Sequence, residues 1–398
     1  METWLIELAK GIGRLFLNPL LYWSIILAVL VGVKRINSER KIFGLKVFDI
    51  FSEWKGTWTI SLVSGVLISV LLLGVGMVFS YETILLLSVV VVSFSLTIRF
   101  TMLSASYTIG TTYLILLFIP FFLDNQSFAN ASLFSTTNFT GLTILLGLFL
   151  LIEAILMVRT KRNETFPHLK IGQRGKWIGQ HHLKRASIIP FFVLIPSGMI
   201  TSFAPFWPYF SIGGETYSIL LVPFLLGFDH VVKGSLPQPA GKRIARSIAT
   251  LGVIVLLLSI GSIFVTWISL IAVIIAILGR EYISYRHRVS DKEKSPYFHM
   301  NNKGLKVLSI IPGTPADRLD ILVGETIIKV NGKKINDVNA FYQALQASGA
   351  SFKLELLDDS DEVRLLQSAL YQGEHHELGI IFSNSQYPKE LFHADSLN

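Results

Sequence analysis

The sequence predicts a polytopic α-helical membrane domain followed by a small soluble α+β domain. The first observation is composition: 51% of the 398 residues are hydrophobic, only 16% are charged, and the mean hydropathy is +0.55. This is too apolar for a soluble chain, so most of it is expected to lie in lipid. The second is charge asymmetry, because residues 1–279 hold 21 basic and 11 acidic side chains, and residues 280–398 hold 14 and 16. The net charge of +8 therefore belongs to the apolar part, which argues against nucleic-acid binding.

Several classes of chemistry are excluded by what the sequence lacks. It has no cysteine, so disulfides, cysteine-ligated metals and thiol nucleophiles are excluded. It has neither an H-E-x-x-H metal-binding motif nor a G-x-x-x-x-G-K-S/T phosphate loop. The histidine pairs His181-His182 and His375-His376 are adjacent, so their rings point apart and are expected to be solvated. We therefore expect no catalytic residue, no cofactor and no metal site.

Apolar segments of spanning length fill the first 279 residues. A helix needs roughly 17–25 apolar residues to cross the hydrocarbon core. The predicted spans lie near residues 15–33, 58–79, 83–100, 107–123, 141–158, 186–206 and 216–232. The apolar stretch 247–279 is too long for one span, and Gly261-Ser262 near its middle predicts a hairpin of two. Residues 2–14 resemble an interfacial amphipathic helix ahead of Asn18-Pro19, so the count is eight or nine spans. No signal-peptide pattern opens the chain, so these residues are expected to remain in the mature protein.

The loops predict the orientation. Six Lys or Arg residues lie in 34–57, eight in 159–185 and four in 233–246. The alternate loops, 80–82, 124–140 and 204–216, have none. By the positive-inside rule the basic loops face the cytoplasm, and so does the charged linker 280–296.

Four ionisable residues fall inside the predicted spans. Arg99 and Glu153 lie near cytoplasmic ends, where we expect their side chains to snorkel to the interface. Asp229 and His230 lie near such an end as well, and their role stays open. The proline-rich sixth span has no counterpart in the first half of the chain, which favours a kinked structural span over the broken helices of a transporter.

The C-terminal region reads as a small globular domain of strands and one helix. The predicted strands span residues 304–311, 324–332, 352–357, 363–367 and 378–382. Asn331-Gly332 is a strong hairpin-turn signal. A helix is predicted over Val338–Ala347, capped by Asn336 or Asp337 and stopped by Ser348-Gly349.

Three motifs in this region match the signature of bacterial PDZ domains. They are Pro-Gly-Thr-Pro-Ala at 312–316, Gly-Glu-Thr-Ile at 324–327 and Val-Asn-Gly at 330–332, with Glu325 where the family usually has Asp. Residues 297–385 therefore resemble a PDZ domain, with 386–398 as a tail. The resemblance implies a module that binds an extended peptide at a sheet edge beside its helix.

The resemblance also implies candidate peptide-binding residues. Phe341 and Leu345 on the predicted helix are candidates to line the groove, and the alternative is that both are core residues. The Leu-Gly-hydrophobic loop that holds a ligand carboxylate usually precedes the first strand in bacterial members, but 297–303 lacks it. Leu378, Gly379 and Ile380 have the matching pattern at the other end of the domain. Recognition of a free C-terminus stays open.

Several spans, the basic loop 34–57 and one C-terminal PDZ domain together resemble the membrane adaptors of the Min division-site system in Bacillus-type bacteria. The resemblance implies a protein of septa and cell poles that catalyses nothing. It also implies that the protein bridges a DivIVA-like polar scaffold to a MinD-like ATPase, which recruits the division inhibitor MinC. Membrane lipids are expected partners, and a homo-oligomer is left open. The alternative is a transporter or lipid-handling membrane protein with a regulatory PDZ domain. Intramembrane zinc proteases also combine spans with a PDZ domain, but the missing H-E-x-x-H motif excludes that class.

Overall fold

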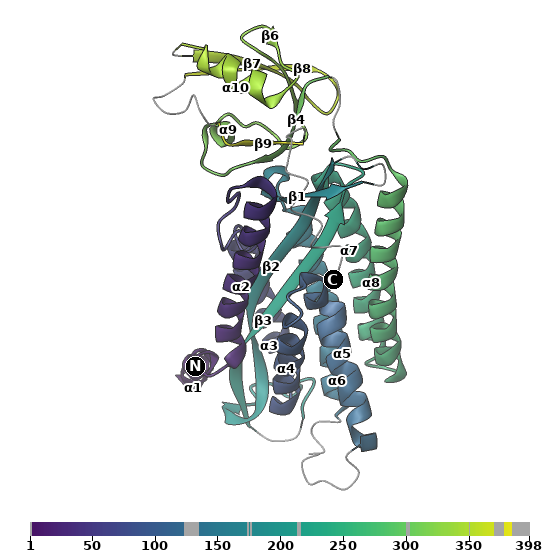
Figure 1. Ribbon diagram of the computed structural model, residues 1–398. Helices are drawn as coiled ribbons and strands as arrows, with labels where there is room; N and C mark the ends of the chain where they lie inside the picture. Colours follow the sequence, from purple (N-terminus) through teal and green to yellow (C-terminus); the bar gives the residue numbers. More distant parts are fainter. Residues whose placement is uncertain are drawn as a thin grey trace.

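The computed structural model describes residues 2–122, 135–172, 175, 177–212, 216–299, 303–349, 351–369 and 378–383. Figure 1 shows an elongated molecule in which a bundle of helices surrounds a long β-ribbon and a small β-rich domain sits on one end. The predicted order, a helical membrane domain and then a small α+β domain, is confirmed. His375-His376 and the tail 386–398 lie outside the described residues.

The membrane domain holds five described helices that are long and apolar enough to span a bilayer. They are α2 (Pro19–Phe43), α3 (Trp58–Val75), α6 (Thr136–Val158), α7 (Pro237–Gly261) and α8 (Trp267–Glu293). Two shorter apolar helices, α4 (Tyr81–Ser95) and α5 (Ala105–Phe122), pack among them, with a 3₁₀ turn at Phe100–Leu103. The hairpin of α7 and α8 confirms the division of the stretch 247–279.

The N-terminal segment forms the amphipathic helix expected of it. This helix, α1 (Glu2–Leu15), exposes Leu5, Leu8 and Ile12, as an interfacial helix does. The side chain of Asn18 caps the next helix, α2, because its Oδ1 accepts a hydrogen bond from the Leu20 N–H at 3.0 Å. The chain therefore breaks between α1 and α2 at the predicted position.

The expected sixth and seventh spans, 186–206 and 216–232, are not helices. Residues in these segments belong to two strands, β2 (Trp177–Thr201) and β3 (Thr216–Val232), which pair antiparallel along nearly their whole length. Together with the short β1 (Phe166–Ile171) they form a three-stranded sheet in the order β1-β2-β3. Pro190 and Pro223 face each other across the ribbon, and proline is costly inside a helix but tolerated at the edge of a sheet. Strand β2 extends to about 80 Å at roughly 3.3 Å per residue, long enough to cross a bilayer and project beyond it.

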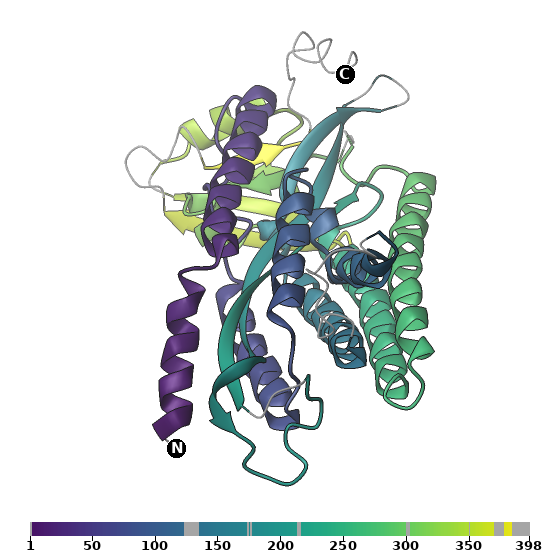
Figure 2. The same cartoon turned by 90° about the horizontal axis from the view of Figure 1, so that it is seen from below.

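The two-stranded ribbon can lie within the membrane domain because helices cover it and shield its backbone from lipid. Figure 2 shows the ribbon running between α1 and α2 on one side and α7 and α8 on the other. Helix α3 presents Ser61, Gly65 and Ser69 to β2 at intervals of four residues. A side chain on Gly65 would collide with the Pro190 carbonyl, and Ser69 Oγ accepts the Phe192 N–H at 2.8 Å. Helix α3 thus approaches closely and satisfies an edge donor that lipid would leave unpaired.

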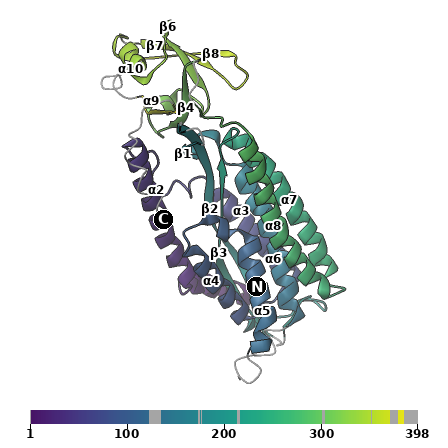
Figure 3. The ribbon, with the colours of Figure 1, turned by 45° about the vertical axis from the view of Figure 1, so that its right-hand side comes forward.

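The loops that lack basic residues meet at the end of the bundle away from the β-rich domain. Met77 and Val78 form β-bridges with Phe210 and Leu194, and the Ser80 N–H donates to Asn138 Oδ1 at 3.0 Å. The basic loops meet at the opposite end, under the β-rich domain (Figure 3). The predicted grouping of the loops into two sets therefore matches the described geometry.

The C-terminal domain is a five-stranded sheet with a short hairpin strand and two helices. The sheet order is β8-β7-β5-β4-β9, with β6 paired to β5. The strands are β4 (Leu305–Ile310), β5 (Thr326–Val330), β6 (Lys333–Lys334), β7 (Ser351–Leu357), β8 (Val363–Ala369) and β9 (Ile380–Phe382). The helices are α9 (Pro315–Arg318) and α10 (Val338–Gln346), the latter capped by Asp337 through a 2.7 Å bond from the Ala340 N–H. These elements agree with the predicted ones to within two residues at nearly every boundary.

Candidate peptide-binding site

The site begins with β9, the last strand of the sheet. Its described pairing is with β4 alone, so its other side, the β9 edge, has no strand partner among the described residues. Helix α10 packs against β9, because the rings of Phe341 and Phe382 lie 5.2 Å apart in an edge-to-face arrangement. A sheet edge beside a helix is the arrangement at which PDZ domains add a peptide strand.

The segment before β9 is held by the Pro-Gly-Thr-Pro-Ala turn. Gly379 has a φ of +79°, and a side chain there would collide with Thr314, so only glycine fits. The Gly379 carbonyl accepts the Ile311 N–H at 2.9 Å, and the Leu378 carbonyl accepts the Ala316 N–H at 3.0 Å. The first of the three family motifs and the Leu-Gly pattern therefore form one local structure, although they lie over 60 residues apart in sequence.

All five predicted site residues come together, and all five are buried, so the side chains of Phe341, Leu345, Leu378 and Ile380 belong to the domain core. Phe341 and Leu345 are 0% exposed and belong to the same apolar cluster as Leu378 and Ile380. The alternative reading of Phe341 and Leu345 as core residues is therefore the one that agrees with their burial, because a fully buried side chain has no surface to offer a ligand.

Two residues beside them were not among the predicted site residues. Val338 and Tyr342 are half-buried and lie on the same side of α10 as the core residues, at the edge of its apolar face. The signal that could have found them is helical spacing, because Val338 lies three residues before Phe341 and Tyr342 lies three residues before Leu345. Both are partly accessible side chains of α10 that pack next to the core, and both are larger than Ala340, which is also half-buried.

Glu325, the departure from the family motif, has a structural role. Its Oε2 accepts the Leu322 N–H at 2.9 Å and its Oε1 accepts from Arg364 at 2.8 Å. Arg364 also donates to the Asp320 carbonyl at 3.1 Å. This carboxylate is buried, and together with Arg364 it braces the loop 320–323, which faces the membrane domain.

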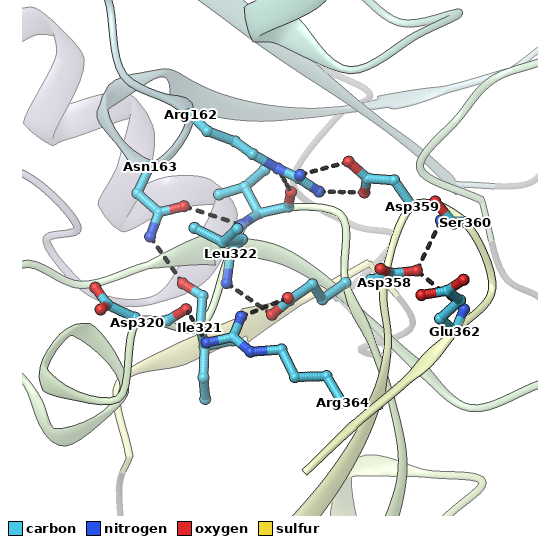
Figure 4. Close-up of polar contacts among 12 residues, drawn as sticks. Arg162, Asn163, Asp320, Ile321, Leu322, Asp358, Asp359, Ser360, Glu362 and Arg364 are labelled. Carbon is cyan, nitrogen blue, oxygen red and sulfur yellow. Dashed lines mark hydrogen bonds and ion pairs between the residues drawn. The ribbon is translucent and has the colours of Figure 1, made fainter. Parts of the chain in front are cut away.

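That loop is hydrogen-bonded to the membrane domain. Figure 4 shows Asn163, from the basic segment 159–185, reaching it with both ends of its side chain. Asn163 Oδ1 accepts the Val323 N–H at 2.9 Å, and Nδ2 donates to the Ile321 carbonyl at 2.8 Å. Beside it, Arg162 makes a two-pronged ion pair with Asp359, with both N···O distances at 2.6 Å, and also donates to the Val323 carbonyl. Paired bonds of this kind fix orientation as well as position.

Apolar side chains fill the rest of this contact, which we call the docking face. One buried cluster joins all three basic loops to the C-terminal domain. From the loops it takes Ile42, Val47, Phe48, Phe166, Leu169 and Leu236, and from the C-terminal part Phe298, Leu308, Val323 and Ile381. Ile381 is the middle residue of β9, whose neighbours Ile380 and Phe382 face the domain core. Strand β9 is therefore packed on both faces, one against its own domain and one against the membrane domain.

The chain enters the C-terminal domain through backbone pairing with the membrane domain. The Tyr297 N–H donates to the Lys233 carbonyl at 2.7 Å, and the Phe298 carbonyl accepts the Gly179 N–H at 2.8 Å. The ring of His181 lies 4.6 Å from that of Phe298 and is fully buried. Burial lowers the pKa of His181 from 6.5 to about 3, with a further lowering from the adjacent His182. The imidazole is therefore neutral at physiological pH, and His181 is not the solvated residue that its position in a basic loop predicted.

The ionisable residues of the spans are mostly paired. Glu153 and Arg280 are each 0% exposed and form an ion pair of 2.9 Å, and Ser104 donates to Glu153 at 2.6 Å. The expectation that Glu153 snorkels is therefore wrong, because its partner on α8 lets the carboxylate stay buried. His230 lies 3.2 Å from Arg280 in the same network. Asp229 pairs with His182 at 3.0 Å, whereas Arg99 is exposed as expected.

Comparison with known proteins identifies the family of the C-terminal domain and relatives of the whole chain. A family model described as a PDZ domain matches residues 306–357. With the spanning helices, this defines a class: polytopic membrane proteins that carry a PDZ domain. The chain is 35% identical over 379 residues to the cell division topological determinant MinJ of Bacillus subtilis (strain 168), covering 95% of this chain and 96% of that protein. Probable cell division topological determinants MinJ of Lacticaseibacillus paracasei and of Lacticaseibacillus casei (strain BD-II) are each 21% identical, covering 94% of this chain and 98% of theirs. The chain belongs to the MinJ family of cell division topological determinants.

Proposed function

We propose that this protein is a membrane adaptor of cell division that presents its PDZ domain at a fixed orientation on the cytoplasmic face of the membrane. It bridges a DivIVA-like polar scaffold to a MinD-like ATPase at septa and cell poles, and placement of these partners, rather than catalysis, is its function. The observation that carries the proposal is the β9 edge beside α10, with the domain behind it fastened to the membrane domain. Of the two strands that end the described sheet, β8 and β9, it is β9 that lies beside α10, and a fixed platform with such an edge suits a protein that positions a partner.

The cytoplasmic side follows from charge. The apolar cluster of the docking face contains residues from all three basic loops together with the PDZ domain, so these elements share one side of the membrane. The positive-inside rule assigns that side to the cytoplasm. A reporter fused after Asn398 tests this: we expect cytoplasmic fluorescence and no alkaline phosphatase activity. An active periplasmic phosphatase at that position would reverse the orientation.

The buried ion pair supports an adaptor over a transporter. Glu153 and Arg280 neutralise each other in their ion pair. The Arg280 guanidinium also lies within hydrogen-bond distance of Ser104, Ser284 and His230. A transport site needs polar groups that are available to a substrate. This network has its polar groups matched within the chain and suits a clamp between α6 and α8.

Partner capture by the full-length chain in mild detergent tests the β9 edge. Tyr342→Glu places a charge on the half-buried face of α10, and Gln343→Glu places the same charge one residue away on the exposed face. Buried apolar anchors contribute on the order of 2 kcal/mol each, so we expect Tyr342→Glu to weaken capture of the MinD-like or DivIVA-like partner about thirtyfold. Gln343→Glu should bind as the parent does. Equal binding by both variants would move the partner site away from the β9 edge, and the basic loops 34–57 and 159–185 would become the candidates.

A further inference from the structure

A basic hollow lies between the start of α7 and the end of α8, on the side of the molecule away from α2. It consists of two adjoining cavities of about 580 Å³ and 760 Å³ that share Arg243, Arg246 and Lys294. Lys242 lines the smaller cavity and Arg286 the larger. Four basic side chains of α7 and α8, together with Lys294 directly after α8, therefore surround one space, which the adaptor function does not use.

The charges of these five side chains are not neutralised within the described residues. None of them forms an ion pair there, and Arg243 makes one bond of 3.3 Å to the Ser235 hydroxyl. One carboxylate, Asp291, lines the hollow, but its two oxygens accept the Lys233 and Gly234 N–H groups at 3.0 and 2.9 Å. His287, also on the wall, is bonded to the Val231 carbonyl at 2.9 Å. The hollow therefore carries a positive surplus, whereas four buried or half-buried arginines elsewhere are paired with carboxylates: Arg35, Arg162, Arg185 and Arg280.

The wall of the hollow changes from basic to apolar toward the middle of the membrane. Below Arg246 the larger cavity is lined by Thr250, Leu251 and Ile254 on α7 and by Ile283 on α8. Ile254 follows Arg246 by eight residues, which is about 12 Å along a helix at 1.5 Å per residue. A cationic site at the interface therefore continues into an apolar groove at the depth of acyl chains.

We propose that the basic hollow binds an anionic phospholipid, with its phosphate among the arginines of α7 and α8 and an acyl chain along the apolar groove. Basic pockets between spans on the cytoplasmic side suit phosphate headgroups. The apolar continuation favours a lipid over a soluble anion or an acidic protein segment, because neither of these would use it. Lys294 and Tyr297 also line the hollow, and the Tyr297 N–H is bonded to Lys233, so a bound lipid touches the connection into the PDZ domain.

Thermal melting of the full-length chain in mild detergent, titrated with phosphatidylglycerol or phosphatidylcholine, tests the proposal. A ligand that binds the folded state raises its melting temperature. The test variant is Arg246→Gln/Arg286→Gln. Its matched control, Arg40→Gln/Arg288→Gln, removes the same charge from exposed arginines outside the hollow, one of them two residues from Arg286. A second variant, Ser247→Asp, adds a negative charge to the wall and leaves every arginine in place.

We expect phosphatidylglycerol, and not phosphatidylcholine, to stabilise the parent and the control. The double arginine variant should need about thirtyfold more phosphatidylglycerol for the same shift, which is about 2 kcal/mol at 1.4 kcal/mol per tenfold. Ser247→Asp should also respond more weakly than the parent. Equal responses of all variants would overturn the site. If inorganic phosphate stabilised the parent as much as phosphatidylglycerol does, the ligand would not be a lipid. The same conclusion would follow if polyglutamate, but not phosphatidylglycerol, stabilised the parent more than the double arginine variant.

Discussion

The docking face and the β9 edge are two sides of the same PDZ domain, and they differ in how their polar groups are satisfied. On the docking face, the backbone of the loop 320–323 finds its partners in Arg162 and Asn163 of the same chain. At the β9 edge, the described sheet ends without a further strand. Unpaired strand edges are templates for another chain, whereas a face with its bonds already made is not. We therefore propose that one side of the domain fixes its orientation and that the other binds a partner.

The largest effect is expected where α10 meets the domain core. Leu345→Asp buries a carboxylate without a partner, which costs several kcal/mol and should unfold the PDZ domain. Gln346→Asp, one residue away on the exposed face, should leave it folded. Limited proteolysis of the full-length chain measures this through new cleavage sites in residues 303–369. If Leu345→Asp stays resistant and loses only its partner, Leu345 lines the binding site after all.

A smaller effect is expected at the docking face. Arg162→Gln/Asn163→Leu removes the ion pair with Asp359 and the three bonds to the loop 320–323, and should weaken docking by about 3 kcal/mol. The amide of Val323 should then exchange its hydrogen more than a hundredfold faster, while amides in the core of the PDZ domain keep their protection. Lys161→Gln, the exposed neighbour, is the control. Unchanged exchange at Val323 would mean that the apolar cluster alone holds the domain.

The smallest effect is a pH dependence of the same face. The folded pKa of His181 is about 3 and its ordinary value is 6.5, so the unfolded chain takes up a proton first as the pH falls. The contribution of His181 to stability is therefore complete above pH 6.5 and is lost progressively as the pH falls toward 3. Between pH 7.5 and 5.5 the loss is about 1.4 kcal/mol. His181→Gln should remove this part of the difference in melting temperature between the two pH values. A variant with the full pH dependence of the parent would show that His181 does not contribute to it.

Local signals in the sequence predicted the PDZ domain and failed for the ribbon. Asn331-Gly332, the Asp337 cap and the alternating strands are signals within a few residues, so each element could be placed. Residues 188–195 of β2 and 219–228 of β3 are apolar at consecutive positions, and such segments have no polar alternation to distinguish them from spanning helices. The prolines of these segments are the signal that argues against a helix, although the sequence analysis attributes them to a kinked span.

The remaining misses are contacts between distant parts of the chain. Glu153 and Arg280 are 127 residues apart, and Asn163 and Val323 are 160 apart. No periodicity within one segment reports such a pairing. The full burial of Phe341 and Leu345 could not be predicted for the same reason, since the helical pattern identifies an apolar face but not what covers it.

Hydrogen exchange of the full-length chain, alone and with its MinD-like or DivIVA-like partner, tests the central claim most directly. The amides of Gly179 and Val323 donate across the docking face, at 2.8 and 2.9 Å. The account predicts that both are protected whether or not the partner is present, and that the amides of β9 gain protection only when it is added. Fast exchange of Gly179 and Val323 in the chain alone, or new protection there instead of at β9, would contradict it.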